Sequence, residues 1–347
     1  MTRPSRSIRD RLTLPAYILL FAALVVTMLF CVCLGSVRIP LSDTVTAFMC
    51  ALRGQPAPSG IARGIILNVR LPRVLLVSLC GAALSLCGAA MQGLLRNPLA
   101  DGSTMGVSSG AALGAVIAMA FGITLPGYAY GGIMIMSMLF AFGSLMLILT
   151  MAFILDRSLS TNSIILIGVI FSMLVSSLIS IIITFNSDHT RSLAFWTMGS
   201  FSGANFDQVL LMAAALLICG TVIMCHAREL NAFAIGEENA RHIGVNVKKA
   251  KLVILITVSA LIGITVSMCG TISFVGLVMP HIARMLVGPN HKKLLPASLF
   301  SGAVFLLLAD LTARTIASPI ELSIGVVTSL VGAVGFVLIF YRSRRKL

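Results

Sequence analysis

The sequence has few charged residues: Asp, Glu, Lys and Arg make up 10% of its 347 positions. A soluble domain usually carries about 25% charged residues, whereas this chain is 58% hydrophobic with a mean hydropathy of +1.04. An ordinary globular fold is therefore excluded. The alternation over segments of ~10 residues that a water-filled membrane barrel requires is also absent. We predict an all-α membrane protein, because the chain is long enough for about ten helices of ~20 residues each.

Sequence patterns for catalysis and metal binding are missing as well. The chain contains no Gly-Lys pair, so it has no P-loop with which to bind ATP. It has no nucleophile elbow and no metalloprotease motif, and its five histidines are scattered. Its eight cysteines lie mostly in apolar runs, without metal-site or disulfide spacing. We therefore predict that the chain is not an enzyme and has no metal site or cofactor of its own.

Charge-free stretches predict the membrane spans. They lie at about 12–37, 74–95, 102–121, 128–155, 158–185, 208–227, 252–272, 294–317 and 322–341. A tenth candidate at about 274–287 is too short to cross straight and contains Pro280, so we expect a short helix tucked among the others. The first stretch has 26 uncharged residues, more than the roughly 7–15 of a signal peptide. Residues 1–347 are therefore interpreted as a single transmembrane domain with an uncleaved first span.

Ten spans place both termini on the same side of the membrane. In this arrangement 18 Lys and Arg residues lie on one side and 7 on the other. The positive-inside rule assigns the richer side to the cytoplasm, so we expect both termini there. This topology in a lipid bilayer also explains the net charge of +14, and nucleic-acid binding is not predicted.

The longest cytoplasmic insertion, at about 228–250, contains a short capped helix. Acids at its start, bases at its end and glycine beyond are typical of such a helix. The residues that carry this pattern are Gly236, Glu237, Glu238, Ala240, Arg241 and Gly244. A free helix needs ~12–15 residues to be stable, so this one must dock on something. It either lies on the lipid surface or forms a rigid plug for a cytoplasmic partner.

Two groups of charged residues stand at the start of, or inside, predicted spans. Arg70 and Arg73 flank Pro72, which suits the first turn of the second span. Arginines at that positive dipole end cost ~0.3–1 kcal/mol each, and either lipid phosphates or carboxylates of an extracytoplasmic partner would offset the cost. Asp310 and Arg314 are predicted to pair at i, i+4; this structural role is favoured over a proton or ion relay.

Small residues at helical spacing predict close helix packing in three spans. These residues are Gly106, Gly110 and Gly114, then Gly81, Ser85 and Gly88, and finally Gly325, Ser329 and Gly332. A different polar group, Ser160, Thr161 and Asn162, begins the fifth span on the cytoplasmic side. Residues of these types commonly cap helices.

Several blocks of the sequence resemble the iron-chelate and cobalamin permeases of FecCD type, which belong to ABC importers. The blocks are R-L-P-R at 70–73, G-A-A-M-Q-G-L-L-R-N-P-L-A-D at 88–101, G-V-S-S-G-A at 106–111, W-T-M-G-S-F at 196–201, G-E-E-N-A-R-H-I-G-V at 236–245, I-S-F-V-G-L-V-M-P-H-I-A-R at 272–284, L-L-L-A-D at 306–310 and E-L-S-I-G-V-V-T at 321–328. The resemblance covers nearly the whole chain and is weakest over about the first 60 residues. It implies the fold of a type II ABC importer permease.

This resemblance also implies a function and a set of partners. The chain would be the permease subunit of a bacterial importer that moves a ferric siderophore, haem or cobalamin across the cytoplasmic (inner) membrane. Its partners would be cytoplasmic ATPase subunits, which bind ATP and Mg, an extracytoplasmic substrate-binding protein, and a second permease chain, identical or related. The alternative from another class is a gradient-driven secondary transporter of a small polar solute, with functional intramembrane charge and no ATPase.

The resemblance assigns roles to three groups of residues. The 236–245 segment resembles the coupling helix that enters the ATPase groove. Arg70, Arg73 and Arg314 match arginines that receive acidic residues of the binding protein. Thr161 and Asn162, next to Ser160, match a cytoplasmic gate.

Overall fold

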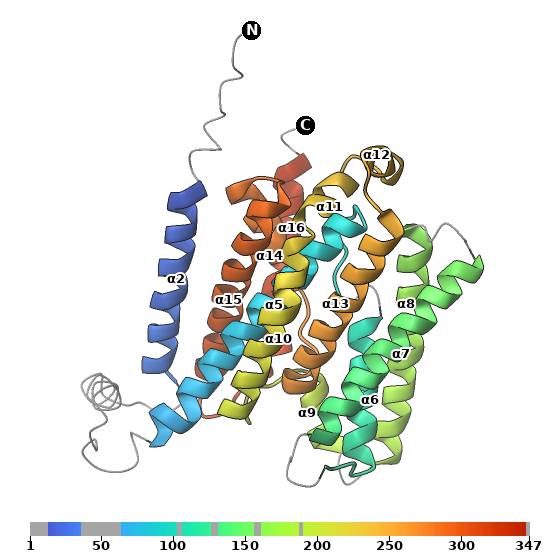
Figure 1. Cartoon of the computed structure of the whole chain (residues 1–347). Helices are drawn as coiled ribbons and strands as arrows, with labels where there is room; N and C mark the ends of the chain where they lie inside the picture. The colour runs from blue at the N-terminus through green and yellow to red at the C-terminus, as the bar shows by residue number, and fades with distance from the viewer. Residues whose placement is uncertain are drawn as a thin grey trace.

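A computed structural model describes residues 13–35, 64–102, 106–125, 131–155, 161–186 and 190–344. Within these residues the regular elements are helices, drawn side by side in Figure 1. The main helices of the bundle are α2 (Thr13–Cys33), α5 (Leu71–Leu94), α6 (Val107–Ala120), α7 (Gly131–Leu155), α8 (Thr161–Phe185), α10 (Phe206–Cys225), α13 (Val247–Cys269), α14 (Val275–Val287), α15 (His291–Thr315) and α16 (Ile324–Arg344). The shorter elements are the π-helix η1 (Ile66–Arg70), α9 (Thr190–Thr197), α11 (Ala227–Phe233) and α12 (Glu237–His242).

The lengths and composition of these helices match a multi-pass membrane protein. Seven of the described helices are long and apolar enough to cross a membrane. Three shorter apolar helices accompany them: α6, α14 and the stretch Ile324–Val337 of α16. Together they occupy the positions of the ten spans that the sequence predicts. The predicted all-helical membrane bundle is therefore confirmed.

Two of the short helices, α6 and α14, begin inside the bundle. Gly106 precedes α6 and Phe274 precedes α14, each with a φ of 70°. Residues 270–274 join α13 to α14 without forming a helix. Irregular backbone at membrane depth is tolerated where protein or an internal cavity surrounds it, so this connection marks an interior surface.

The centre of the bundle is α5, which is buried along most of its length. The predicted small-residue face of this helix lies against α14 and α15. A Cβ atom added to Gly88 would lie 1.9 Å from the carbonyl oxygen of Gly276, and one added to Gly81 would lie 2.5 Å from that of Gly302. Only glycine permits these backbone approaches. The three helices are therefore packed backbone to backbone and form a tight unit.

The second predicted small-residue set brings α6 against α7. A Cβ atom on Gly110 would collide with the Ser144 hydroxyl, and one on Gly114 would lie 2.3 Å from the carbonyl oxygen of Met136. In α16, a Cβ on Gly332 would lie 2.4 Å from Cβ of Phe274. The prediction of close packing is confirmed in all three spans.

The second span begins earlier than the sequence predicts. The sequence predicts Pro72 in the first turn of a helix, with Arg70 and Arg73 at its N-terminus. Pro72 does lie in the first turn of α5, but the continuous helical span starts earlier and runs over Ile66–Leu94. The π-helix η1 lies immediately before Pro72, and local π geometry is one way in which a helix accommodates proline. The arginines are therefore inside a helix, and the predicted dipole penalty at a helix start is wrong.

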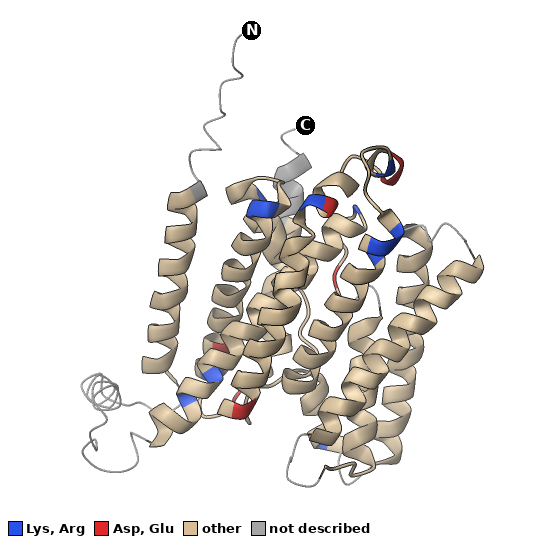
Figure 2. Ribbon diagram, viewed as in Figure 1, with Lys and Arg blue, Asp and Glu red and all other residues tan. Residues whose placement is uncertain are grey.

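Charged residues mark the two ends of the bundle. Figure 2 shows that nearly all charged residues gather at the ends, with few between them. One end carries α11 and α12, and the start of α2 and the C-terminal part of α16 lie at the same end (Figure 1). We call it the α12 end, and we call the opposite end, where α5 begins, the Arg73 end.

Candidate functional sites

The predicted short helix at the α12 end is present. It covers Glu237–His242, with two acids in its first turn and Arg241 and His242 in its last turn. Gly236 precedes it with φ 109° and ψ 151°, a backbone conformation that is essentially restricted to glycine. Gly244 follows it with a φ of 89°. Both glycines therefore set the directions in which the chain enters and leaves α12.

One side of α12 is fixed to the bundle. Ala240 is fully buried, and its carbonyl oxygen accepts a hydrogen bond from the Val245 N–H at 3.0 Å. Glu237 Oε1 lies 2.6 Å from Nζ of Lys251 in α13. Two large apolar side chains flank the helix on its open side, since Ile243 is 63% exposed and Ile235 is 56% exposed.

The remaining side chains of α12 point outward. The exposed residues are Glu238, Asn239, Arg241 and His242. The helix thus presents charged and apolar groups to the outside, while its inner side is fixed to the bundle by Ala240 and by the ion pair of Glu237 with Lys251. Such a surface is suited to contact with another protein at this end of the bundle.

An ion network at the Arg73 end joins three elements. Arg73 of α5 donates from Nη2 to Asp310 Oδ1 of α15 at 2.9 Å and from Nη1 to Glu321 Oε2 at 2.9 Å. Arg314 Nε lies 2.9 Å from Asp310 Oδ2, so the predicted i, i+4 pair is confirmed. Neither partner of Arg73 could be predicted from local sequence, because Asp310 and Glu321 are 237 and 248 positions away from it.

Two arginines at this end also bind the last turn of α2. Arg70 Nη1 donates to the carbonyl oxygens of Val32 and Cys33 at 2.9 and 2.8 Å. Arg314 Nη2 donates to the carbonyl oxygen of Cys31 at 3.4 Å. The last carbonyls of a helix have no partner within it and carry its negative dipole end. Both arginines therefore stabilise the end of α2.

The three arginines expected to dock a binding protein are brought together, but they are buried. Arg70, Arg73 and Arg314 each expose less than a tenth of their surface. The outward-facing member of their network is Glu321, whose side chain is 30% exposed. A docking carboxylate would therefore approach the network past Glu321. The docking role itself stays a prediction.

The predicted gate residues lie at the start of α8. Thr161 is the first residue of this helix and the exposed Asn162 is the second, whereas Ser160 lies outside the described residues. Nothing in the described contacts tests whether they close a path, so the gate stays a prediction.

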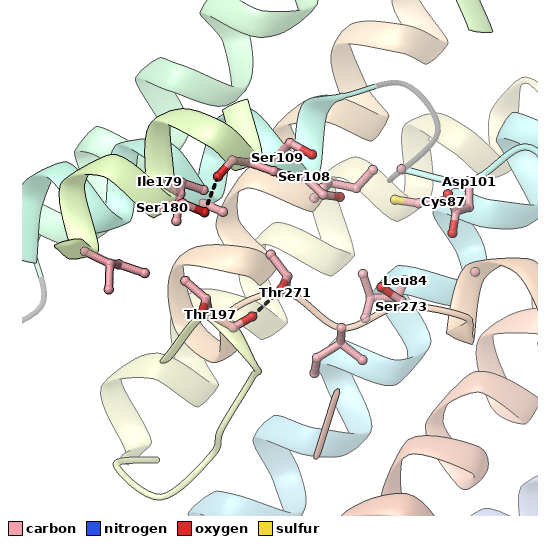
Figure 3. Close-up of a pocket in the computed structure, with 17 residues that line it drawn as sticks. Leu84, Cys87, Asp101, Ser108, Ser109, Ile179, Ser180, Thr197, Thr271 and Ser273 are labelled. Carbon is pink, nitrogen blue, oxygen red and sulfur yellow. Dashed lines mark hydrogen bonds between the residues drawn. The ribbon is translucent and has the colours of Figure 1, made fainter. Parts of the chain in front are cut away.

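A polar cavity of about 410 Å³ lies within the bundle, between α5, α6, α8 and the irregular connection before α14. Figure 3 shows hydroxyl groups from several elements around it. Its polar lining comprises Asp101, Ser108, Ser109, Ser176, Ser180, Thr197, Thr271 and Ser273. The Thr271 hydroxyl donates to the carbonyl oxygen of Thr197 at 2.5 Å, which ties the connection to the end of α9.

The cavity continues onto a row of hydroxyls along α8. Ser172, Ser176, Ser180 and Thr184 are four residues apart and so share one face of the helix. Each hydroxyl donates to the carbonyl four residues earlier at 2.8–2.9 Å. Sequence reasoning missed this row, although its four-residue spacing was the signal that could have revealed it.

The described residues hold no cluster of three or more His, Cys, Asp or Glu side chains that could bind a metal ion. The described cysteines are free thiols. A helical membrane bundle with a polar internal cavity and a short, exposed helix at one end is consistent with a membrane transport protein.

Comparisons with known proteins identify which transport subunit it is. The chain belongs to the FecCD transport family, whose match covers residues 23–342. It is therefore a membrane permease of an ABC importer, which is not itself an enzyme. Permeases of this kind work with separate ATPase and substrate-binding partners.

Three relatives show how far this similarity extends. The uncharacterised permease YvrB of Bacillus subtilis is 42% identical over 332 residues, which are 95% of this chain and 94% of YvrB. The molybdate permease MolB of Haemophilus influenzae is 35% identical, covering 82% of this chain and 83% of its own. The haemin permease HmuU of Yersinia pestis is 38% identical, covering 81% and 84%.

A solved structure has the same fold. It is an inward-facing transporter assigned to the metal-chelate type of ABC transporter, and it is 32% identical with a TM-score of 0.81. The match covers 94% of this chain and 98% of that one. The predicted type II importer permease fold is therefore confirmed, whereas the named cargoes of the relatives differ.

Proposed function

We propose that this permease carries a metal chelate, namely a ferric siderophore, haem or cobalamin, inward across the bacterial cytoplasmic membrane. The relative named for haemin and the structural neighbour of metal-chelate type support this cargo class. The relative named for molybdate supports a small oxyanion instead. Against that alternative, the described residues that line the cavity include the carboxylate of Asp101 and no Lys or Arg, so they offer no cation to offset the charge of a small free oxyanion.

The main support for ATP-driven transport is α12, a short exposed helix that is fixed to the bundle on one side. The chain has no P-loop, so energy from ATP must arrive through contact with another subunit. α12 offers a short element that is anchored by Ala240 and by the ion pair of Glu237 with Lys251. We assign ATPase coupling to Gly236, Glu237, Glu238, Ala240, Arg241 and Gly244. The α12 end, which also carries the start of α2, is then cytoplasmic.

The polar surface of α8 is assigned to the translocation path. The donors of the hydroxyl row are paired within α8, but the adjoining cavity is lined by the Asp101 carboxylate and further hydroxyls, which favour water over lipid. A second permease chain, identical or related, would cover this surface and leave a hydrophilic path between the two copies. ATP and Mg belong to the ATPase subunits in this scheme, and the permease needs no cofactor of its own.

The gradient-driven alternative would use an intramembrane charge as an ion relay. The candidate is Asp310, but its carboxylate contacts both Arg73 and Arg314. Each of its two oxygens thus lies 2.9 Å from an arginine side chain, as in a structural ion pair. This geometry disfavours the alternative.

Transport by the purified system tests the proposal. The permease is reconstituted in liposomes with its ATPase and binding protein, and uptake of a ferric hydroxamate, haem, cobalamin and molybdate is compared. We expect ATP-dependent uptake of one of the chelates that continues when ionophores collapse ion gradients. Uptake of molybdate alone would contradict the cargo class, and loss of uptake with ionophores at fixed ATP would contradict the energy source.

A further inference from the structure

The turn that begins α15 is bound by a single side chain of α11. Asn231 Oδ1 accepts a hydrogen bond from the backbone N–H of His291 at 2.8 Å and lies 2.9 Å from His291 Nδ1. Asn231 Nδ2 donates to Asn290 Oδ1 at 2.9 Å. One amide group thus makes three polar contacts with two consecutive residues of the turn.

The turn is held rigidly on its other sides. Asn290 caps α15 by accepting from the Lys292 N–H at 3.1 Å. The buried His291 ring packs on Gly93 of α5, where an added Cβ would lie 2.3 Å from Nε2. The Tyr17 hydroxyl of α2 donates to the carbonyl oxygen of Lys293 at 2.6 Å. Residues 290–293 therefore join α2, α5, α11 and α15.

Asn231 links α11, which leads to α12, with α15, which extends to the Arg73 end of the bundle. α11 ends at Phe233, shortly before α12 begins at Glu237. α15 runs without interruption over His291–Thr315 and carries the Asp310 carboxylate of the ion network at the Arg73 end. α12 is therefore joined to α11 through residues 234–236 and to α13 through the Glu237–Lys251 ion pair. Among the described residues, Asn231 provides the polar connection from α11 to α15.

We propose that Asn231 is a positioning residue that transmits the movement of α12 to α15 and so to the Arg73 end. This inference rests on the proposed coupling role of α12. The contacts favour the amide because hydrogen bonds are directional, whereas the apolar contact of a buried side chain such as Phe233 permits sliding. Removal of the amide also leaves the first N–H of α15 without its partner.

The first test compares transport with ATP hydrolysis in the reconstituted complex of permease, ATPase and binding protein. In Asn231→Ala we expect the ATPase to stay bound and basal hydrolysis to continue. Substrate moved per ATP should fall at least about fivefold, the lower range of typical coupling between sites. Asn290→Ser keeps a good capping residue, but its side chain is too short to accept the hydrogen bond from Asn231, so it should also lower the substrate moved per ATP. The double variant should lower it no further than Asn231→Ala does, because both substitutions break the same connection between α11 and α15.

A matched control removes hydrogen bonds at a distant helix start. Asn205 forms a capping box with Gln208 at the beginning of α10, and Asn205→Ala should leave transport per ATP unchanged. A wild-type ratio in Asn231→Ala would overturn the proposal. Loss of the ATPase from the Asn231→Ala complex would overturn it as well, because Asn231 would then act in assembly.

A second measurement needs no transported cargo. A spin label at Thr315→Cys, in a variant without native cysteines, reports on the far end of α15. We expect an ATP-driven change in its spectrum with wild-type Asn231 and no change with Asn231→Ala, although hydrolysis continues in both. A persistent change in the Asn231→Ala protein would refute the link. Because the readout is independent of cargo, an error in the proposed substrate class would leave this result intact.

Discussion

The guanidinium of Arg73 lies 2.9 Å from the carboxylate of Glu321, and this ion pair ties α5 to the connection before α16. The two side chains differ in exposure, at 9% for Arg73 and 30% for Glu321. On its other side Arg73 contacts Asp310, whose side chain is 1% exposed. The network therefore has a buried half and a half that reaches solvent. Removal of the Asp310 carboxylate should therefore have a different effect from removal of the Glu321 carboxylate.

Removal of the buried carboxylate should destabilise the permease strongly. Asp310→Ala leaves Arg73 and Arg314 without the charge they share, and an uncompensated buried charge costs about 3–5 kcal/mol. Glu321→Gln is the matched control, since a partly exposed pair contributes about 0–1 kcal/mol. Thermal unfolding of the purified permease in detergent measures both. Equal midpoints for the two variants would contradict the assignment of Asp310 as the centre of the network.

Removal of the Glu321 charge should strengthen docking of the binding protein. If an acidic residue of the partner binds Arg73, it must compete with Glu321 for Nη1. Glu321→Gln should therefore strengthen binding a few-fold, by less than about 1 kcal/mol, and the gain should shrink at high salt. Titration of the binding protein onto the immobilised permease measures this effect. Weaker binding would argue against the docking role of these arginines.

The sequence predicted the helical bundle well because span positions depend on local hydropathy. It also predicted α12, whose acids, bases and flanking glycines lie within a few consecutive residues. The partners of Arg73 were missed because Asp310 and Glu321 are more than 200 positions away in sequence. Their pairing is produced by the packing of α5 against α15, which no local pattern encodes.

Other features were missed for local reasons. The four-residue spacing of the hydroxyls of α8 is visible in the sequence, but only the cavity beside them distinguishes this row from ordinary helix sequence. The short α9 has too few residues to be recognised as a span, although Trp196 and its neighbours carry the family resemblance. The start of the second span was misplaced because Pro72 usually marks a helix beginning, and here a π-turn precedes it.

Both chain termini should lie in the cytoplasm. The charge asymmetry of the sequence predicts this orientation, and the start of α2 and the C-terminal part of α16 share one end of the bundle (Figure 1). Cysteines introduced at Ser5 and Ser343 in a cysteine-free variant should resist impermeant thiol reagents in intact cells. They should react after the cells are lysed. Labelling of either position from outside would reverse or rule out the ten-span topology.

The hydroxyl row of α8 should face water. A cysteine at the exposed Ser177, next to the row, should react with a hydrophilic thiol reagent in the assembled importer, and its reactivity should change when ATP binds. Leu217→Cys is the control, because this apolar and exposed side chain of α10 is expected to face lipid and to react slowly. Equal, slow labelling of both positions would remove α8 from the translocation path.

Coupling should depend on the shape of α12 as well as on its presence. Gly244 has a φ of 89° with open space around its Cβ position, so Gly244→Ala meets no clash but strains the backbone by ~1–2 kcal/mol. Gly143 of α7 also has open space and has an ordinary helical backbone, so Gly143→Ala should be neutral or slightly stabilising. We expect Gly244→Ala to lower transport per ATP and Gly143→Ala to leave it unchanged. Equal ratios in the two variants would show that the left-handed turn after α12 is not needed.

Deletion of Glu237–Ile243 is the more severe form of this test. The deletion removes α12 but leaves the described transmembrane helices intact, so the permease should still insert and fold. Because the ATPase has lost its contact, it should no longer be retained on an affinity column that carries the permease, and transport should stop. A conformational equilibrium responds to an effector only through contacts that differ between its two states, and α12 is the element we assign to that contact. If the deleted permease still retained its ATPase and moved substrate, α12 would be better interpreted as a helix that lies on the lipid surface.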